Sequence, residues 1–417
     1  MNTAVEASLA RAPEMGPQDT AAAGRRIVSI DIFRGITMAV MIFVNELSGV
    51  GGMPWWTRHA PGRLDYMTYV DMVFPFFLFA VGMSLPLSVA QRLKRNPSLP
   101  ALWLHIASRS IALIVLGLIL ANADKADPAR MAMNGSAWGL LGLLGAMLYL
   151  GVYGTSEKAK AVGRILRAIG LAGVILLLAI FRRNTPSGHA GWLDFSYPEI
   201  LGLIGFSYFA AAILYVPTRR RAWAPWMWFV LLMALCALSS VRWTAFPSRL
   251  PIYAWPFGNG AMCSMVMAGA SVSSIFLDGG TKGGPHKATL AGAGFAALAL
   301  VAGRLLTPLG VSKIRATPTW CLYSIAAATL LFTVLYWVCD VKGGRRWVAA
   351  FRPAGLNTLL TYLLPDLWYF ALGSAGIAYF GTHWNTGWPG VARTAAFTVA
   401  MLGVAAALTR AKVRLQL

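Results

Sequence analysis

The sequence predicts an all-α fold: a polytopic integral membrane bundle of about 11 to 12 transmembrane helices with no soluble domain. Hydrophobic residues make up 57% of the 417 residues, charged residues only 12%, and the mean hydropathy is +0.61. This composition lies outside the range of soluble globular domains. Apolar runs of about 20 residues, enough to cross the hydrocarbon core, recur along the whole chain. The 16 Trp and 13 Tyr residues suit two interfacial aromatic belts.

Hydropathy windows of about 19 residues place the expected spans in chain order. They lie at 35–53, 69–90, 103–122, 137–154, 164–181, 199–216, 224–241, 258–277, 287–306, 318–338, 354–372 and 391–409. The span at 354–372 is the weakest, because prolines, glycines and an aspartate lie in or beside it. Eleven transmembrane spans are therefore the alternative to twelve.

Residues 1–24 are polar and rich in alanine, without an apolar run. A secretory signal needs such a run, so we expect a disordered cytoplasmic tail and not a signal peptide. The first span would then direct insertion. Residues 25–417 are expected to form a single transmembrane domain.

The formal net charge of +21 comes from basic residues in short clusters between the apolar runs. That distribution is typical of cytoplasmic loops facing anionic membrane lipids, and it argues against nucleic acid as a partner. If the N-terminus is cytoplasmic, about two thirds of the 36 Lys and Arg residues fall in inner loops. Both termini are then cytoplasmic, and the loop that contains His59 faces the other side.

The four cysteines fall within or at the ends of apolar runs and show no CxxC spacing. We interpret them as small hydrophobic residues and expect neither disulfides nor a metal site.

Polar residues form a stripe on the first predicted helix. Asp31 and Arg34 are i,i+3 neighbours, and Asn45 follows Arg34 by about three turns on the same face. Two readings stay open. The stripe is either a cytoplasmic anchor pair with an interhelical amide bond, or part of a substrate cavity.

His59 and Asp71 flank the start of the second span, with Asp65 between them. Imidazole titrates near neutral pH, so His59 can accept a proton from an amine or hydroxyl, or attack a thioester itself. The alternative is an ordinary interfacial histidine. Pro75 has no N–H, so the carbonyl of Asp71 loses its usual helical partner and must find another. A carboxylate and a free carbonyl at one residue favour a functional site over a simple helix N-terminus.

Near the end of the chain, Asn357 and Asp366 lie in the interrupted span. Broken helices in membranes commonly line a cavity, so both residues are candidates for binding substrate.

Several short segments together resemble a known family. They are Ser29-Ile30-Asp31-Ile32-Phe33-Arg34-Gly35, Val44-Asn45, His59-Ala60, the stretch from Asp71 to Gly82, and Gly355-Leu356-Asn357-Thr358. In this order they are similar to the heparan-alpha-glucosaminide N-acetyltransferase family of transmembrane acyltransferases. The longer spacing from His59 to Asp71 is closer to a bacterial branch associated with amino-sugar utilisation.

The resemblance implies an acyltransferase-like domain over 25–417, in a bacterial inner membrane and as a homodimer. It implies transfer of acetyl from cytosolic acetyl-CoA to a glucosamine-type amino sugar or glycan, without a metal. His59 would be the general base or a transient acetyl carrier, and Asp71 or Asp65 would orient its ring. Asp31, Arg34, Asn45, Asn357 and Asp366 are the expected substrate-binding residues. Cations of the inner loops would hold the CoA phosphates, and the candidates are Arg92, Arg109, Arg219, Arg220, Arg345 and Arg346.

Two other classes of function remain open. Intramembrane aspartates and broken helices are also features of proton-coupled secondary transporters of sugars or small solutes. A third possibility is a non-catalytic membrane subunit that serves a partner enzyme.

Overall fold

The computed structural model describes residues 28–416 except 186–187, 242–256, 345 and 347. The expected tail at 1–24 and the candidate residue Arg345 therefore lie outside the described residues. The described chain is helical, apart from a two-stranded antiparallel hairpin of β1 (Arg183–Asn184) and β2 (Ala190–Gly191) and a few isolated bridges.

The helices follow the expected order. They are α2 (Val28–Ser48), α3 (Val73–Arg95), α4 (Leu99–Ala123), α5 (Gly135–Leu150), α6 (Glu157–Ile180), α7 (Glu199–Thr218), α8 (Ala224–Ser240), α10 (Ala261–Lys282), α11 (Gly284–Leu305), α12 (Pro318–Tyr336), α13 (Arg352–Leu356), α14 (Thr358–Ser374), α15 (Tyr379–Thr382) and α16 (Gly387–Arg410). Short helices η2 (Trp55–Thr57), η3 (Tyr69–Met72) and η4 (Thr307–Leu309) lie in the connections, and a π-turn, η5 (Trp337–Val341), extends α12.

Within the described chain, eight helices are long and apolar enough to cross a membrane, and three shorter apolar helices accompany them. This confirms a polytopic helical membrane protein. Each predicted span falls on a helix, but α2 is already helical at Val28, the first described residue, earlier than the predicted 35–53. The polar residues of its first two turns shifted the hydropathy window toward the C-terminus.

The eleventh span is broken, as its composition predicts. The break falls at Asn357, whose non-helical backbone (φ −126°, ψ 50°) separates α13 from α14. Pro365 does not break the helix and lies inside α14.

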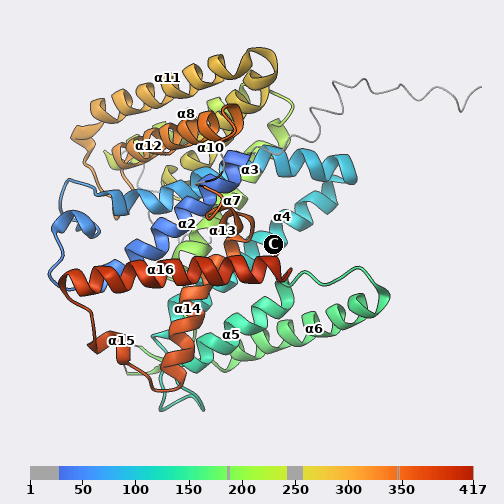
Figure 1. Cartoon of the computed structure of the whole chain (residues 1–417), viewed down its shortest axis with the longest axis vertical. Coiled ribbons are helices and arrows are strands. Elements are labelled where there is room, and N and C mark those ends of the chain that lie inside the picture. The colour runs from blue at the N-terminus through green and yellow to red at the C-terminus, as the bar shows by residue number, and fades with distance from the viewer. Residues whose placement is uncertain (1–27, 186–187, 242–256, 345, 347, 417) are drawn as a thin grey trace, which may run out of the picture.

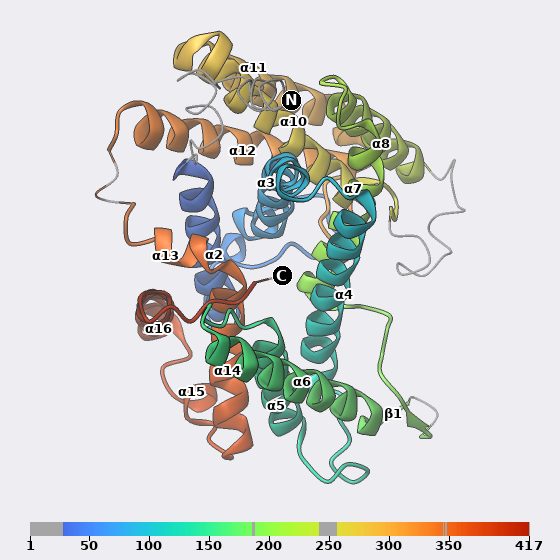
Figure 2. The ribbon, with the colours of Figure 1, turned by 90° about the vertical axis from the view of Figure 1, so that its right-hand side faces the viewer.

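Figures 1 and 2 show how the helices are grouped. Helices α8, α10, α11 and α12 lie at one end of the molecule and α5, α6, α14 and α15 at the other, with α2, α3, α4 and α7 between them. Large side chains such as Phe33, Phe79 and Phe332 fill the centre and are almost fully buried.

The central helix α3 packs against α10 with unusually close backbones. A Cβ on Gly82 would lie 1.9 Å from the carbonyl oxygen of Val266, and a Cβ on Gly269 would lie 2.1 Å from that of Phe79. Membrane helices commonly approach through such small residues, because packing and not hydrophobic burial drives their association. This contact fixes α3, and with it the site at its N-terminal end.

Candidate active site

The predicted pair of His59 and Asp71 is in contact. Nδ1 of His59 lies 2.7 Å from Oδ1 of Asp71. The other carboxylate oxygen accepts hydrogen bonds from the backbone N–H of Ala60 (3.2 Å) and of Thr68 (3.0 Å). The Asp71 side chain is fully buried, and these donors offset the cost of burying its charge.

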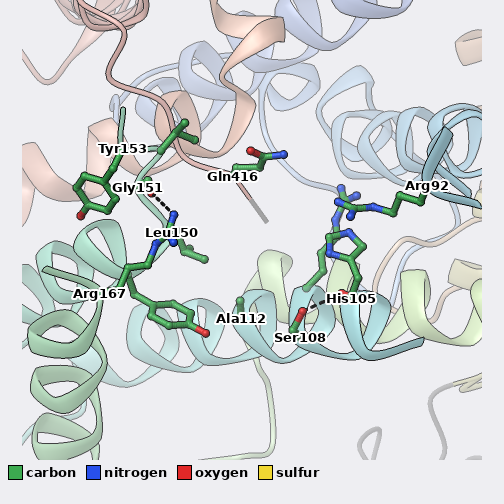
Figure 3. A pocket seen from close by; sticks show the side chains of 12 residues that line it. Arg92, His105, Ser108, Ala112, Leu150, Gly151, Tyr153, Arg167 and Gln416 are labelled. Carbon is green, nitrogen blue, oxygen red and sulfur yellow. Dashed lines mark hydrogen bonds between the residues drawn. The ribbon is translucent and has the colours of Figure 1, made fainter. Parts of the chain in front are cut away.

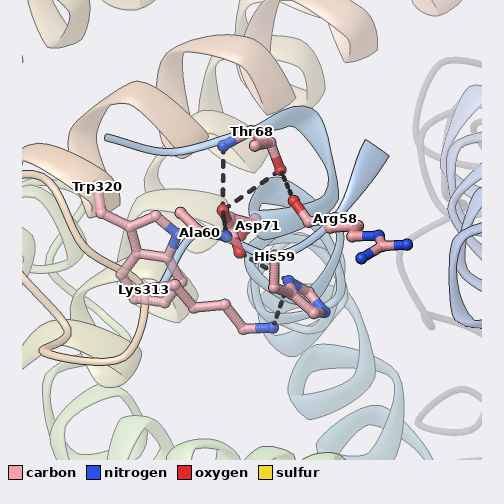
Figure 4. Close-up of polar contacts among 7 residues, drawn as sticks. All are labelled: Arg58, His59, Ala60, Thr68, Asp71, Lys313 and Trp320. Carbon is pink, nitrogen blue, oxygen red and sulfur yellow. Dashed lines mark hydrogen bonds and ion pairs between the residues drawn. The ribbon is translucent and has the colours of Figure 1, made fainter. Parts of the chain in front are cut away.

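The local sequence explains this geometry. Thr68 and Asp71 form a capping box at the start of η3, the pattern in which the fourth residue bonds back to the N-cap. The Thr68 hydroxyl also donates to the carbonyl of Arg58 (2.9 Å), which ties the histidine loop to the same turn. Figure 4 shows Thr68 bonded both to the carboxylate of Asp71 and to the carbonyl of Arg58.

The carbonyl released by Pro75 has found its partner on another helix. The indole N–H of Trp320, at the start of α12, donates to the backbone oxygen of Asp71 at 2.9 Å. The indole is almost fully buried, so this bond anchors α12 to η3 beneath the site.

The contacts of Asp71 fix the tautomer of His59. An ionised carboxylate has no proton to donate, so Nδ1 must carry the hydrogen and Nε2 of a neutral ring is a free acceptor. The His59 side chain is 44% exposed, whereas its partner is buried. The arrangement is that of an oriented general base whose reactive nitrogen can meet a ligand.

Asp65 does not share the His59 contact. It forms an ion pair with Arg315 and accepts from the backbone N–H of Val311 at 3.0 Å. The bonded guanidinium of Arg315 and the Val311 N–H hold the pKa of Asp65 below its ordinary value. These bonds anchor the segment 310–317 between α11 and α12. The catalytic role expected of Asp65 stays a prediction.

That segment carries Lys313, which sequence reasoning missed. Nζ of Lys313 lies 3.5 Å from Nδ1 of His59. Burial lowers the pKa of Lys313, and the charges of Asp71 and Glu199 act in the opposite direction. In the orientation expected from the sequence this segment is an outer loop, where the positive-inside rule makes cations scarce, and that scarcity is the signal that could have identified Lys313.

A second missed pair lies at the start of α7. The hydroxyl of Tyr362, on α14, contacts both carboxylate oxygens of Glu199 at 3.2 and 3.1 Å. Glu199 has a left-handed backbone with φ of +57°, which costs of order 1–3 kcal/mol in a residue other than glycine. Asp366, one of the predicted substrate residues, lies within electrostatic range of Glu199.

The polar stripe of α2 is divided between two places. Asp31 and Arg34 form the expected ion pair at 3.7 Å, and Arg34 also bonds Ser84 on α3. Asn45 is exposed near the opposite end of the helix. The stripe is therefore an anchor pair at one end and an accessible amide at the other.

Asn357 is buried and binds the C-terminal segment. Its amide donates to the carbonyl of Val413 (2.8 Å) and accepts from the N–H of Leu415 (3.3 Å). These contacts fix the segment after α16 against the break between α13 and α14. They leave the amide no direct place beside His59.

A basic pocket of about 370 Å³ lies near the other end of α3. Its wall combines the end of α3, the first half of α4, the connection between α5 and α6, and the C-terminal segment. The lining residues are Arg92, His105, Ser108, Arg109, Ala112, Tyr149, Leu150, Gly151, Val152, Tyr153, Arg167 and Gln416. In Figure 3, Arg92 and Arg167 lie on opposite sides of this pocket.

Aromatic rings and carbonyls position the arginines of the pocket. Arg109 lies over the ring of Tyr208 at 4.7 Å, and Arg167 lies over that of Tyr153 at 5.4 Å. Arg167 also donates to the carbonyl of Gly151 at 3.2 Å. Guanidinium groups held in this way are suited to bind phosphate.

The structure brings together only some of the arginines that are predicted to bind the CoA phosphates. Arg92 and Arg109 line the basic pocket, and Arg167 joins them. Arg219 caps α7 by donating to the carbonyl of Val216 (2.6 Å), and neither Arg220 nor Arg346 lines the pocket.

The described residues contain no group of three or more His, Cys, Asp or Glu side chains that could hold a metal ion. All four cysteines are buried.

Comparison with known proteins finds relatives over part of the chain. Heparan-alpha-glucosaminide N-acetyltransferase from Homo sapiens is 35% identical over 127 residues, which are 30% of this chain and 18% of that protein. The enzyme of the same name from Mus musculus is 31% identical over 136 residues, 33% of this chain and 19% of that protein. The match thus spans less than a fifth of the curated relatives, and it confirms the expected resemblance over about a third of this chain. The family model described as a domain of unknown function, DUF5009, matches residues 26–259, more than half of the chain, which therefore belongs to that family.

Proposed function

We propose that this protein is a membrane acetyltransferase that moves an acetyl group from acetyl-CoA to the amino group of a glucosamine-type sugar. The observation that carries the proposal is the His59–Asp71 contact of 2.7 Å, with one ring nitrogen oriented and the ring half-exposed. The similarity to two heparan-alpha-glucosaminide N-acetyltransferases supports the same reaction class.

In the proposed reaction His59 shuttles one proton. As the acceptor nitrogen attacks the thioester carbonyl, Nε2 takes the amine proton, and Asp71 stabilises the resulting imidazolium. The new C–N bond forms, the C–S bond breaks, and the proton passes from Nε2 to the departing CoA thiolate. The products are an acetamide and CoA, and His59 returns to its neutral form.

The basic pocket is the proposed place for the phosphates of CoA. Three arginines converge there, and a phosphate-bearing donor cannot enter hydrocarbon. Asp71 and Arg92 belong to opposite ends of one span, separated by about 30 Å of helix. The uncharged pantetheine arm of the donor would therefore have to pass between helices toward His59.

This geometry supports an orientation in which the pocket opens to the cytoplasm and His59 faces the opposite side. The start of α2 and the C-terminal segment both pack near α13, which is consistent with two cytoplasmic termini. A homodimer in a bacterial inner membrane, surrounded by anionic lipids, completes the proposal.

The test uses purified protein in lipid nanodiscs with radiolabelled acetyl-CoA and glucosamine. We expect N-acetylglucosamine to form, and H59A to reduce kcat by roughly 10²-fold or more. The matched control is H189A, because His189 lies in an exposed outer loop. Retention of acetyl transfer by H59A would exclude His59 from the reaction. An intact thioester together with glucosamine uptake into vesicles would instead identify a transporter.

A further inference from the structure

Lys313 reaches the His59–Asp71 pair from an element to which neither residue belongs. Its Nζ lies 3.5 Å from Nδ1 of His59, and its charge interacts with both Asp71 and Glu199. Figure 4 shows the lysine side chain extending along Trp320 toward the imidazole. The cation is thus within electrostatic range of both the site and the carboxylate at the start of α7.

Hydrogen bonds and an ion pair fix the segment that carries Lys313. The flanking Val311 and Arg315 are both bonded to Asp65. The N–H of Ser312 donates to the hydroxyl of Thr317 at 3.0 Å, which closes the segment on itself. The lysine is therefore held by a fixed turn.

The contact between Lys313 and His59 is electrostatic. Nδ1 already donates to Asp71, and an ammonium group has only donors, so the two nitrogens cannot share a hydrogen. A cation at this distance disfavours a second positive charge on the ring, whereas the Asp71 carboxylate favours it. The imidazole thus lies beside two neighbours of opposite charge.

We propose that Lys313 is a positioning residue that keeps the His59 imidazole unprotonated beside Asp71, so that Nε2 is ready to accept a proton. This inference rests on the proposed function. A neighbouring carboxylate favours the imidazolium, which cannot act as a base, and a neighbouring cation opposes that effect.

The remaining charged groups around the ring do not supply this effect. The Arg58 guanidinium is turned to the carbonyl of Val50 at 3.2 Å. Asp65 and Arg315 neutralise each other. Glu199, on α7, is an anion whose charge raises the pKa of Lys313, and it therefore supplies no positive charge near the ring. Lys313 is therefore the cation that can oppose Asp71.

The experiment measures the reaction of His59 with diethylpyrocarbonate as a function of pH by peptide mass spectrometry. The reagent acylates the neutral imidazole of a histidine and not its protonated form. We expect K313M to raise the midpoint pH of modification by about one unit or more. K313R keeps the charge and should leave the midpoint in place, and K313Q serves if the methionine variant does not fold. K287M is the matched control, because Lys287 is an exposed lysine on α11. The acid limb of kcat/KM for acetyl transfer should move by the same amount as the modification midpoint.

An unchanged or lower midpoint in folded K313M or K313Q would overturn the inference, as would an equal shift in K313R. The modification assay does not require acetyl transfer. Absence of transfer by the wild-type protein would therefore count against the proposed function, while the effect of Lys313 on the ring could still be read.

Discussion

The chemistry proposed here depends on single atoms, and Oδ1 of Asp71 is one of them. It lies 2.7 Å from Nδ1 of His59, in a carboxylate that no solvent reaches. Because this oxygen selects the tautomer, a neutral amide in its place would leave the ring free to turn or to carry its hydrogen on Nε2.

We therefore expect D71N to reduce kcat by roughly 10²- to 10⁴-fold, with a smaller change in KM. Steady-state kinetics of acetyl transfer would measure the effect. The matched control is D194N, because Asp194 is a carboxylate in the connection between α6 and α7 that is paired with Lys125 at 2.8 Å. A folded D71N variant with the wild-type kcat would show that the contact has no part in the reaction.

At the scale of elements, the site depends on how closely α3 and α10 approach. A Cβ on Gly82 would meet backbone atoms of Val266, which cannot move aside as a flexible side chain can. We expect G82A to destabilise the protein by about 1–3 kcal/mol through overpacking.

Thermal unfolding in detergent would measure this change. The matched control is G173A on α6, where a Cβ would meet nothing within 4 Å. Alanine should there leave the protein unchanged or raise its stability by up to about 1 kcal/mol, because it favours the helix. Equal melting temperatures for the two variants would rule out overpacking as the reason for the glycine.

At the scale of the whole molecule, the proposal places His59 and the basic pocket on opposite sides of the membrane. The native cysteines are all buried, so engineered thiols can report on sidedness against a low background. Arg63, in the His59 loop, and Thr155, between α5 and α6, are both exposed.

We expect a membrane-impermeant maleimide to label R63C in intact cells and T155C only after the membrane is opened. Gel shift or mass spectrometry would detect the label. Labelling of both cysteines from one side would contradict the proposed topology.

Much of the fold could be predicted from the sequence, because the bilayer imposes the length and polarity of each span. The same constraint made His59 and Asp71 conspicuous, and Pro75 predicted the free carbonyl that Trp320 now binds. What could not be predicted were the contacts between segments distant in the chain. Nothing in the sequence near Lys313 indicates that it reaches His59, 254 residues away.

The predicted site residues that lie away from His59 show the same limit of prediction from sequence. Asn357 is a predicted substrate-binding residue in an interrupted helix, but its amide binds the C-terminal segment. Arg167, in contrast, belongs to a cluster that the positive-inside rule already explains, and only the fold brings it opposite Arg92. Periodicity identifies the face of a helix, but tertiary packing decides what that face meets.

The bond from Trp320 to the Asp71 carbonyl has a practical consequence for the design of a more stable variant. Replacing helix prolines with alanine is a standard way to regularise a helix, and Pro75 looks like an obvious target. An alanine there would bring a second donor, its own amide hydrogen, to the oxygen that the indole binds, so the indole would have to share its acceptor. The improved helix would loosen the anchor between α12 and the turn that carries the reactive carboxylate, so this irregularity is best left alone.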